Sequence, residues 1–166
     1  MATPKIDSIE LAKFILAKLG AMPHLKLQKL VYYIEAWHLA IFEESIIRDD
    51  FEAWMHGPVC KRVWKAFRDA TAPVYGMVAL EPKDVRLAIK TAESSLSKDQ
   101  IELIGDVLIE YGDKTSYYLE CLTHSELPWR EARRGVPPDA GSVETISKKT
   151  MKEFYQKALY GKSAKA

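Results

Sequence analysis

The sequence predicts a predominantly α-helical α+β fold, a single compact domain of about six helices with a small antiparallel sheet or hairpin. Three observations lead to this prediction. Apolar residues recur at the 3.6-residue spacing of a helix through much of the chain. Residues 49–55 instead alternate polar and apolar side chains with the two-residue period of a strand. The 166 residues, 48% hydrophobic and 28% charged, have the size and composition of one ordinary globular domain.

The longest helix is expected to begin at about Leu25. Its apolar positions follow the spacing of one wide helical face, which must be buried. They are Leu27, Leu30, Val31, Ile34, Trp37, His38 and Ile41. We take residues 1–166 as one domain, with its core at about residues 9–160 and a flexible tail at residues 161–166.

Capping residues place the other helices. Asp7 or Ser8 can cap a first helix that ends at Gly20. Ser97 and Gln100 form a capping-box pattern that opens another. That helix is expected to end at Gly112. Three more helices are expected to begin at Thr115 or Ser116, at Pro128 and at Ser147.

Residues 71–98 are rich in β-branched side chains and are interrupted by Pro73, Gly76 and Pro82. Val85, Leu87 and Ile89 alternate with more polar neighbours, which predicts a half-exposed strand. We therefore expect a small antiparallel sheet here, with the strand around Phe51 as a candidate member.

A Gly-Pro turn follows the strand around Phe51. Gly57 supplies backbone freedom, and Pro58 suits the first residue of a helix that would run to about Ala70. Free N–H groups at such a helix start favour a carboxylate or a phosphate, and Arg62 could reinforce the site. The alternative, which we favour, is that a side chain of the protein such as Glu52 fills this role and that Trp54 belongs to the core.

The totals set limits on partners and location. The net charge of +1 gives no general attraction to nucleic acid, membranes or acidic substrates. Two cysteines, Cys60 and Cys121, are too few for a disulfide framework and fit a reducing compartment. Charged residues interrupt the apolar N-terminal run, so neither a signal peptide nor a membrane span is expected. We therefore expect a cytoplasmic protein.

No motif predicts an enzyme. The serines and cysteines lack a nucleophile-elbow pattern, and the glycines form no phosphate-binding loop. Two half-sites, His56 with Cys60 and Cys121 with His124, have spacings compatible with zinc. We favour the alternative that these are buried or hydrogen-bonded residues, so no catalytic residue, metal or cofactor is expected.

Basic residues gather in two places, at Arg130, Arg133 and Arg134, and along the C-terminal lysines Lys148, Lys149, Lys152, Lys157, Lys162 and Lys165. Neither group has the helix-turn-helix pattern or the interleaved aromatic residues of a nucleic-acid site. We expect solvated faces, and no nucleic acid as a partner.

Several separated blocks resemble the Panacea domain family, which includes SocA-like antitoxins and GepA-type phage-associated proteins. The Lys-Leu-Gln-Lys-Leu block falls on residues 26–30, followed by Tyr32 or Tyr33. The Glu-Ala-Trp-x-x-Gly-Pro-Val block falls on residues 52–59, and the Thr-His-x-x-x-Pro-Trp block on residues 123–129. The resemblance extends over residues 9–155, and neither cysteine is part of the pattern.

The resemblance implies an antitoxin, a non-catalytic protein that neutralises a toxin encoded beside it by direct binding. It also implies two alternatives, a prophage or mobile-element interaction protein and an adaptor that delivers a client to a protease. Many relatives carry an extra DNA-binding segment, for which we expect no room here. A homo-oligomer stays open. The predicted partner-binding residues are Trp54, His56, Gly57, Pro58, Arg62, His124, Pro128 and Trp129.

Overall fold

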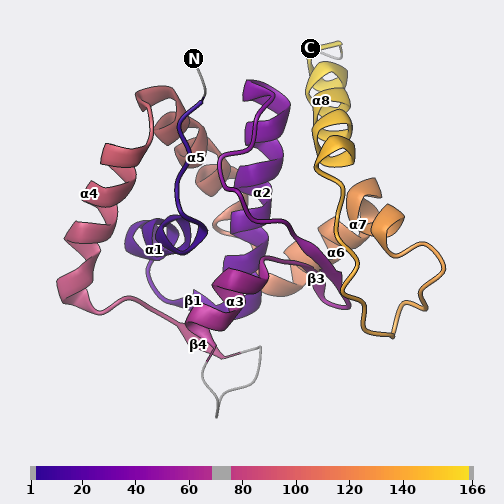
Figure 1. The fold of residues 1–166 in the computed structure, drawn as a ribbon, viewed down its shortest axis with the longest axis horizontal. Coiled ribbons are helices and arrows are strands. Elements are labelled where there is room, and N and C mark those ends of the chain that lie inside the picture. The colour runs from indigo at the N-terminus through magenta and orange to yellow at the C-terminus, as the bar shows by residue number, and fades with distance from the viewer. Residues whose placement is uncertain (1–2, 69–75, 165–166) are drawn as a thin grey trace.

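The computed structural model describes residues 3–68 and 76–164, and the side chains up to residue 161. Within that part of the chain, eight α-helices and four short strands form a mostly helical α+β domain (Figure 1). In chain order they are α1 (Ser8–Leu19), β1 (Met22–Pro23), α2 (His24–Phe42), β2 (Glu52–Trp54), β3 (Gly57–Val59), α3 (Lys61–Phe67), β4 (Met77–Val78), α4 (Val85–Ser95), α5 (Lys98–Tyr111), α6 (Ser116–Ser125), α7 (Leu127–Ala132) and α8 (Lys148–Ala164), with a 3-10 turn at Pro82–Asp84.

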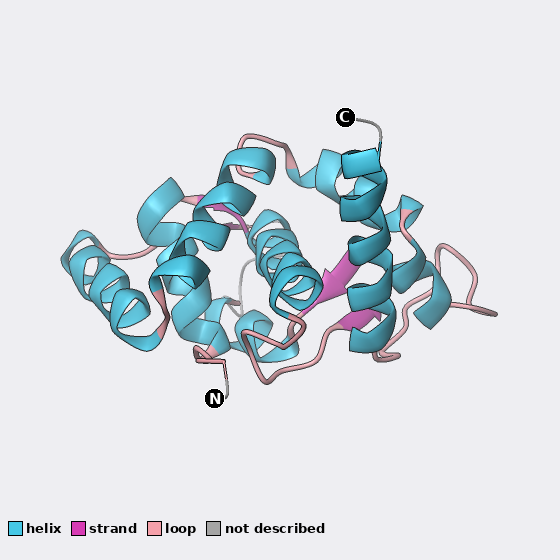
Figure 2. Cartoon of the chain, turned by 90° about the horizontal axis from the view of Figure 1, so that it is seen from above, coloured by secondary structure: helices cyan, strands magenta, loops and turns pink. Residues whose placement is uncertain are grey.

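Helix α2 is the centre of the fold, as the sequence predicts. Figure 2 looks along this helix and shows the other helices arranged around it. Helices α1 and α5 pack on one side of it and α8 on the other, so α2 is buried around most of its circumference. Five of the predicted core positions are fully buried, whereas Trp37 is half-buried and Ile41 is 47% exposed. The C-terminal end of α2 is therefore open to solvent along one edge.

The predicted caps are confirmed. The Asp7 carboxylate accepts hydrogen bonds from the first backbone N–H groups of α1, and Gly20 ends that helix with φ 83°. Ser97 and Gln100 form the expected capping box at the start of α5, which ends at Gly112. The Thr115 side chain caps α6.

The C-terminal part of the prediction is also confirmed. Pro128 lies in the first turn of α7. The loop between α7 and α8 follows, and the Ser147 hydroxyl accepts a hydrogen bond from the Thr150 N–H at the start of α8.

The predicted strand at Val85, Leu87 and Ile89 is wrong, because these residues lie in α4. Ala88 and Ala92, which are four residues apart, are the buried positions of this helix, and α4 packs against α1. Strand β4 pairs instead with β1, and the strand beside Phe51 pairs with β3, so the expected single sheet consists of two separate two-stranded pairs. The part of the predicted sheet at residues 71–75 lies outside the described residues.

The prediction that a helix starts at Pro58 is also wrong, because Pro58 lies in β3 and α3 begins at Lys61. Strands β2 and β3 form a tight hairpin in which Trp54 pairs with Gly57. Helix α3 ends at Phe67 rather than at about Ala70, although residue 70 itself is outside the described range.

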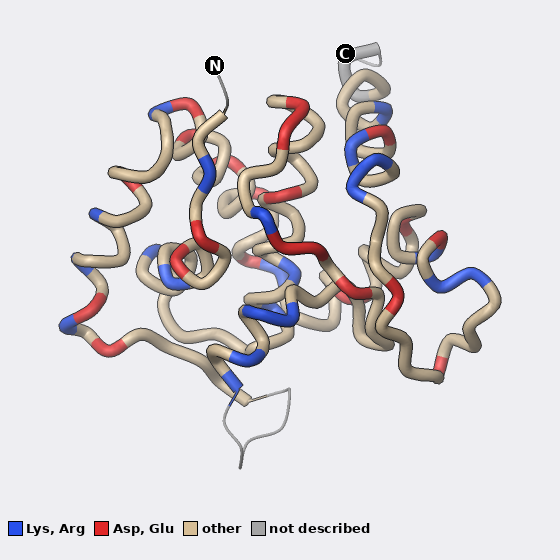
Figure 3. The backbone as a smooth tube through the Cα atoms, in the orientation of Figure 1, with Lys and Arg blue, Asp and Glu red and all other residues tan. Residues whose placement is uncertain are grey.

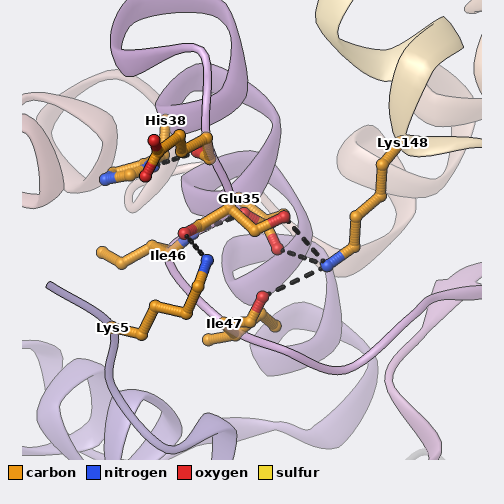
Figure 4. A network of polar contacts seen from close by, with 8 residues as sticks. Lys5, Glu35, His38, Ile46, Ile47 and Lys148 are labelled. Carbon is orange, nitrogen blue, oxygen red and sulfur yellow. Dashed lines mark hydrogen bonds and ion pairs between the residues drawn. The ribbon is translucent and has the colours of Figure 1, made fainter. Parts of the chain in front are cut away.

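A buried ion pair joins the start of α8 to α2 (Figure 4). The Glu35 carboxylate has no exposed surface, accepts a hydrogen bond from the Ile46 N–H at 2.8 Å and pairs with the Lys148 ammonium at 2.9 Å. Lys148 also donates to the carbonyl of Ile47. Burial raises the pKa of Glu35, and Lys148 opposes this shift. Lys148 is thus a structural residue, which corrects the expectation that it belongs to a solvated face.

Candidate partner-binding site

Seven of the eight predicted binding residues lie together where the β2–β3 hairpin meets α6 and α7. We call this set the hairpin corner; it consists of Trp54, His56, Gly57, Pro58, His124, Pro128 and Trp129. The Trp129 indole N–H donates to the Trp54 carbonyl at 2.8 Å, and the Trp129 ring stacks on His124 at a centroid distance of 3.9 Å. These contacts connect the two sequence blocks that surround residues 54 and 129.

Trp129 is mainly a packing residue of the fold and offers little surface to a partner. Its side chain is only 7% exposed, and the Arg133 guanidinium lies over its ring, 4.9 Å from the centroid. Arg133 is itself buried and donates hydrogen bonds to the carbonyls of Ala53, Pro137 and Ala140. The expectation that Arg133 belongs to a solvated basic patch is therefore wrong. The hydrogen bonds of the Arg133 guanidinium hold the loop after α7 against the hairpin.

Gly57 allows the hairpin to approach α2 closely. Its φ of 108° lies in the region that favours glycine, and a Cβ at this position would overlap with the side chain of Lys29. The Thr123 hydroxyl would lie only 3.0 Å from such a Cβ. A side chain at position 57 would therefore force either the Lys29 side chain or the turn itself to shift.

Lys29 is the residue of this site that the sequence analysis missed. It is fully buried under the turn, and its ammonium donates to the Pro58 carbonyl at 3.2 Å. Burial lowers its pKa to about 7, and the charge of Glu120 opposes this shift. A signal was present in the sequence, because Lys29 is four residues after Leu25 and four before Tyr33 and so shares the apolar face of α2.

His56, at the tip of the hairpin, is bonded to α6. Its Nδ1 lies 2.6 Å from the Glu120 carboxylate, and its side chain keeps 33% of its surface exposed. Burial lowers the pKa of His124, which favours the neutral ring, and the buried Nε2 atom of this ring has no hydrogen-bond partner among the described residues.

Trp54 is partly exposed to solvent. Its indole N–H donates to the Glu52 carboxylate at 2.9 Å, and its ring makes an edge contact with Trp64 of α3 at 5.4 Å. The side chain is only half-buried, so it is neither a pure core residue nor a free anchor.

Arg62 is not part of the hairpin corner. It forms an ion pair with Asp7 at the start of α1, beside Arg48 and Asp49. The anion site considered at a helix start at Pro58 is the less favoured interpretation of the sequence, and Pro58 lies in β3 rather than at a helix start. The Cys60 N–H that precedes α3 donates to the Gln28 side chain at 2.9 Å, whereas no described side chain caps α3 itself, so Glu52 does not fill this role.

The four residues of the zinc hypothesis have different environments. Cys60 is buried, Cys121 is exposed on α6, and His56 is bonded to Glu120. Across residues 3–68 and 76–164, no three His, Cys, Asp or Glu side chains gather in a metal-binding arrangement.

An open apolar cavity of about 620 Å³ lies beside the hairpin corner. One wall is the hairpin tip, with Trp54, Met55 and His56, and the other is the loop between α7 and α8, with Val136 and Val143. Backbone hydrogen bonds hold this loop to β2, because the Ala53 N–H donates to the Glu144 carbonyl at 2.8 Å. Both walls are therefore fixed, and Val143 is 71% exposed at the rim.

Comparisons with known proteins agree with the arrangement of these blocks. A family model described as "Antitoxin SocA-like, Panacea domain" matches residues 27–130. Antitoxin SocA of Caulobacter vibrioides (strain NA1000 / CB15N) is 27% identical over 157 residues, which cover 91% of this chain and 83% of that protein. No solved structure matches. In the described part of the chain, no helix has the length and apolar character needed to cross a bilayer. The family match spans more than half of the chain and contains every residue of the hairpin corner, so the chain belongs to the Antitoxin SocA-like, Panacea domain family.

Proposed function

We propose that this protein is an antitoxin that neutralises a toxin protein by direct binding, and that the hairpin corner with its apolar cavity is the toxin-binding surface. The observation that carries the proposal is the family match over residues 27–130, which contains the whole hairpin corner. The relative named Antitoxin SocA, which aligns with 91% of the chain, supports the same role.

The physical character of the corner suits protein binding. A few well-packed aromatic and apolar contacts supply most of the energy of a typical interface. Here Trp54, Met55 and Val143 border a cavity that can accept apolar side chains of a partner. Hydrogen bonds from Lys29 and Trp129 hold the hairpin in one conformation, so binding costs little conformational entropy.

The proposal includes the absence of catalysis. A general base must reach the proton that it abstracts. The Nδ1 of His56 lies 2.6 Å from the Glu120 carboxylate, and the ring of His124 stacks on Trp129. These partners support a positioning role for both histidines. We place this activity in the cytoplasm.

The experiment is co-expression with the product of the neighbouring open reading frame in bacteria, scored by growth and by pull-down. Wild-type protein should restore growth and retain the toxin. Val143→Asp should lose both, because a carboxylate at the cavity rim would be desolvated by an apolar partner. The matched control is Leu87→Asp on α4, where the native side chain is similarly exposed at 63%.

Two results would contradict the proposal. One is unchanged rescue by Val143→Asp in a protein with normal thermal stability. The other is the absence of any neighbouring gene that is toxic without this protein, which would favour the alternative of a mobile-element interaction protein. Rescue accompanied by rapid disappearance of the toxin, rather than by a stable complex, would instead favour the adaptor alternative.

A further inference from the structure

A second surface, toward the C-terminal end of α2, combines an apolar groove with a stripe of carboxylates. The groove of about 220 Å³ lies between α2, α5 and α8. Its apolar lining is Trp37, Ile41, Leu103, Val107, Tyr111 and Leu159. Ile41 is 47% exposed, and Tyr160, next to Leu159 in α8, is 68% exposed.

The groove can take an apolar side chain. An engineered cavity of about 150 Å³ is known to bind benzene, so this volume is sufficient for one bulky apolar anchor. It is smaller than the roughly 300–1,000 Å³ of typical small-molecule sites, which favours an anchor from a polypeptide over a free ligand.

The wall of the groove formed by α5 is acidic. Acidic residues are spaced three or four positions apart along this helix and its C-terminal end, so they share one face. They are Asp99, Glu102, Asp106, Glu110 and Asp113, and all are exposed. Asp106 and Glu110 line the groove itself. At a rise of about 1.5 Å per residue, the stripe is about 21 Å long.

These charges are not neutralised within the described chain. Asp113 has Lys114 at 3.6 Å, whereas no described Lys or Arg forms an ion pair with Asp99, Glu102, Asp106 or Glu110. Like charges on one helix face repel one another, and a cationic partner would relieve this repulsion. The same charges repel the phosphates of nucleic acid.

We propose that this acidic groove, defined by the six apolar residues and the five carboxylates above, is a docking surface for a basic amphipathic α-helix of another protein. The helix inserts apolar side chains between α2, α5 and α8 and pairs its lysines or arginines with the α5 stripe. Its length along the stripe is about 14 residues, since both helices rise by about 1.5 Å per residue. The acidic groove shares no described lining residue with the hairpin corner or with its cavity.

The test uses the full-length protein and two fluorescein-labelled helical peptides of 18 residues, one built from Leu and Lys and one from Leu and Glu in the same pattern. Fluorescence anisotropy in 150 mM salt should show at least tenfold tighter binding of the Leu/Lys peptide. The variant Asp106→Lys/Glu110→Lys should weaken this binding at least tenfold. The control variant Glu81→Lys/Glu93→Lys changes the net charge equally at two exposed positions near α4 and should change affinity less than twofold.

Hydrogen exchange of the complex locates the peptide. Protection is expected in α5 and in the C-terminal half of α2, together with a several-fold loss of affinity in Ile41→Ser but not in Leu87→Ser. Equal effects of the two charge-reversal variants would mean attraction by net charge alone and would overturn the proposal. Failure of the Leu/Lys peptide to bind, or protection at the hairpin corner instead, would also overturn it.

Discussion

At the scale of single residues, Lys29 and Gly57 together fix the turn of the β2–β3 hairpin. The buried ammonium satisfies the Pro58 carbonyl, and the missing side chain of Gly57 leaves the space that the Lys29 stem fills. A buried amine without a carboxylate partner is costly to keep charged, so this arrangement makes stability depend on pH.

Gly57→Ala should therefore destabilise the protein by about 3 kcal/mol, because it combines a left-handed backbone with a clash against Lys29. Gly135→Ala is the matched control. Gly135 also has a positive φ, 86°, but a Cβ there would meet open space, so only the backbone cost of about 1–2 kcal/mol is expected. Urea unfolding measures both values, and equal losses would show that Lys29 does not fill the space beside residue 57.

The pH dependence of stability tests the environment of Lys29. Its pKa is about 7 in the folded protein, below the ordinary lysine value, so the unfolded chain binds more protons between these two values. The free energy of unfolding should thus rise with pH above pH 7, with a contribution from Lys29 of at most about 1.4 kcal/mol per pH unit.

Lys29→Met keeps the packing of the stem and removes the titration. Subtracting its unfolding free energies from those of the wild type between pH 7 and pH 10 isolates the contribution of Lys29 from those of the tyrosines and Cys60. A flat difference over this range would mean that the Lys29 ammonium remains protonated in the folded protein.

At the scale of elements, the packing of α8 onto α2 depends on the buried pair of Glu35 and Lys148. Lys148→Met leaves the buried Glu35 carboxyl group without the ammonium that pairs with it. The expected loss is about 3 kcal/mol, at the lower end for one broken partner of a buried pair because the Lys148 side chain is 20% exposed. Lys149→Met, at the exposed neighbouring position, should cost less than about 0.5 kcal/mol. Thermal or urea unfolding measures the stability of both variants. Equal stabilities would mean that the pair of Glu35 and Lys148 does not stabilise the packing of α8.

The elements that could be predicted from the sequence are those with a local cause. Caps such as Ser97 with Gln100 involve residues three positions apart, so their pattern is visible in the sequence. The residues of α4 predict a strand because five alternating residues fit both periods, and the packing of this helix on α1 decides the outcome. Pro58 predicts a helix for a similar reason. A Gly-Pro step suits a helix start, but hairpin pairing with Ala53 takes precedence.

The candidate site was predicted in part. Seven of its residues lie in two sequence blocks that the fold joins through the Trp129 to Trp54 hydrogen bond. Arg62 follows the first block in sequence, yet the short helix α3 directs it to Asp7. Lys29 and the cavity could not be read from those blocks, since each depends on segments that are far apart in the chain.

At the scale of the whole molecule, the two ends of α2 border two surfaces of different chemistry, because Leu25 lines the cavity and Trp37 and Ile41 line the acidic groove. The hairpin corner offers an apolar cavity with fixed walls, and the acidic groove offers an apolar floor beside carboxylates. Figure 3 shows several basic residues along α8, which also borders the acidic groove through Leu159. The two surfaces therefore suit two different partners, and an antitoxin with both could bind them at the same time.

The most direct test of the central claim is isothermal titration calorimetry of the purified protein with the purified product of the neighbouring toxic gene. The account predicts a saturable complex for the wild type and for Leu87→Asp, and a loss of affinity of at least about tenfold, or about 1.4 kcal/mol, for Val143→Asp. Equal affinity of all three proteins would contradict the assignment of the hairpin corner. Neutralisation of the toxin in cells without measurable binding in solution would contradict the claim that this protein acts by direct contact.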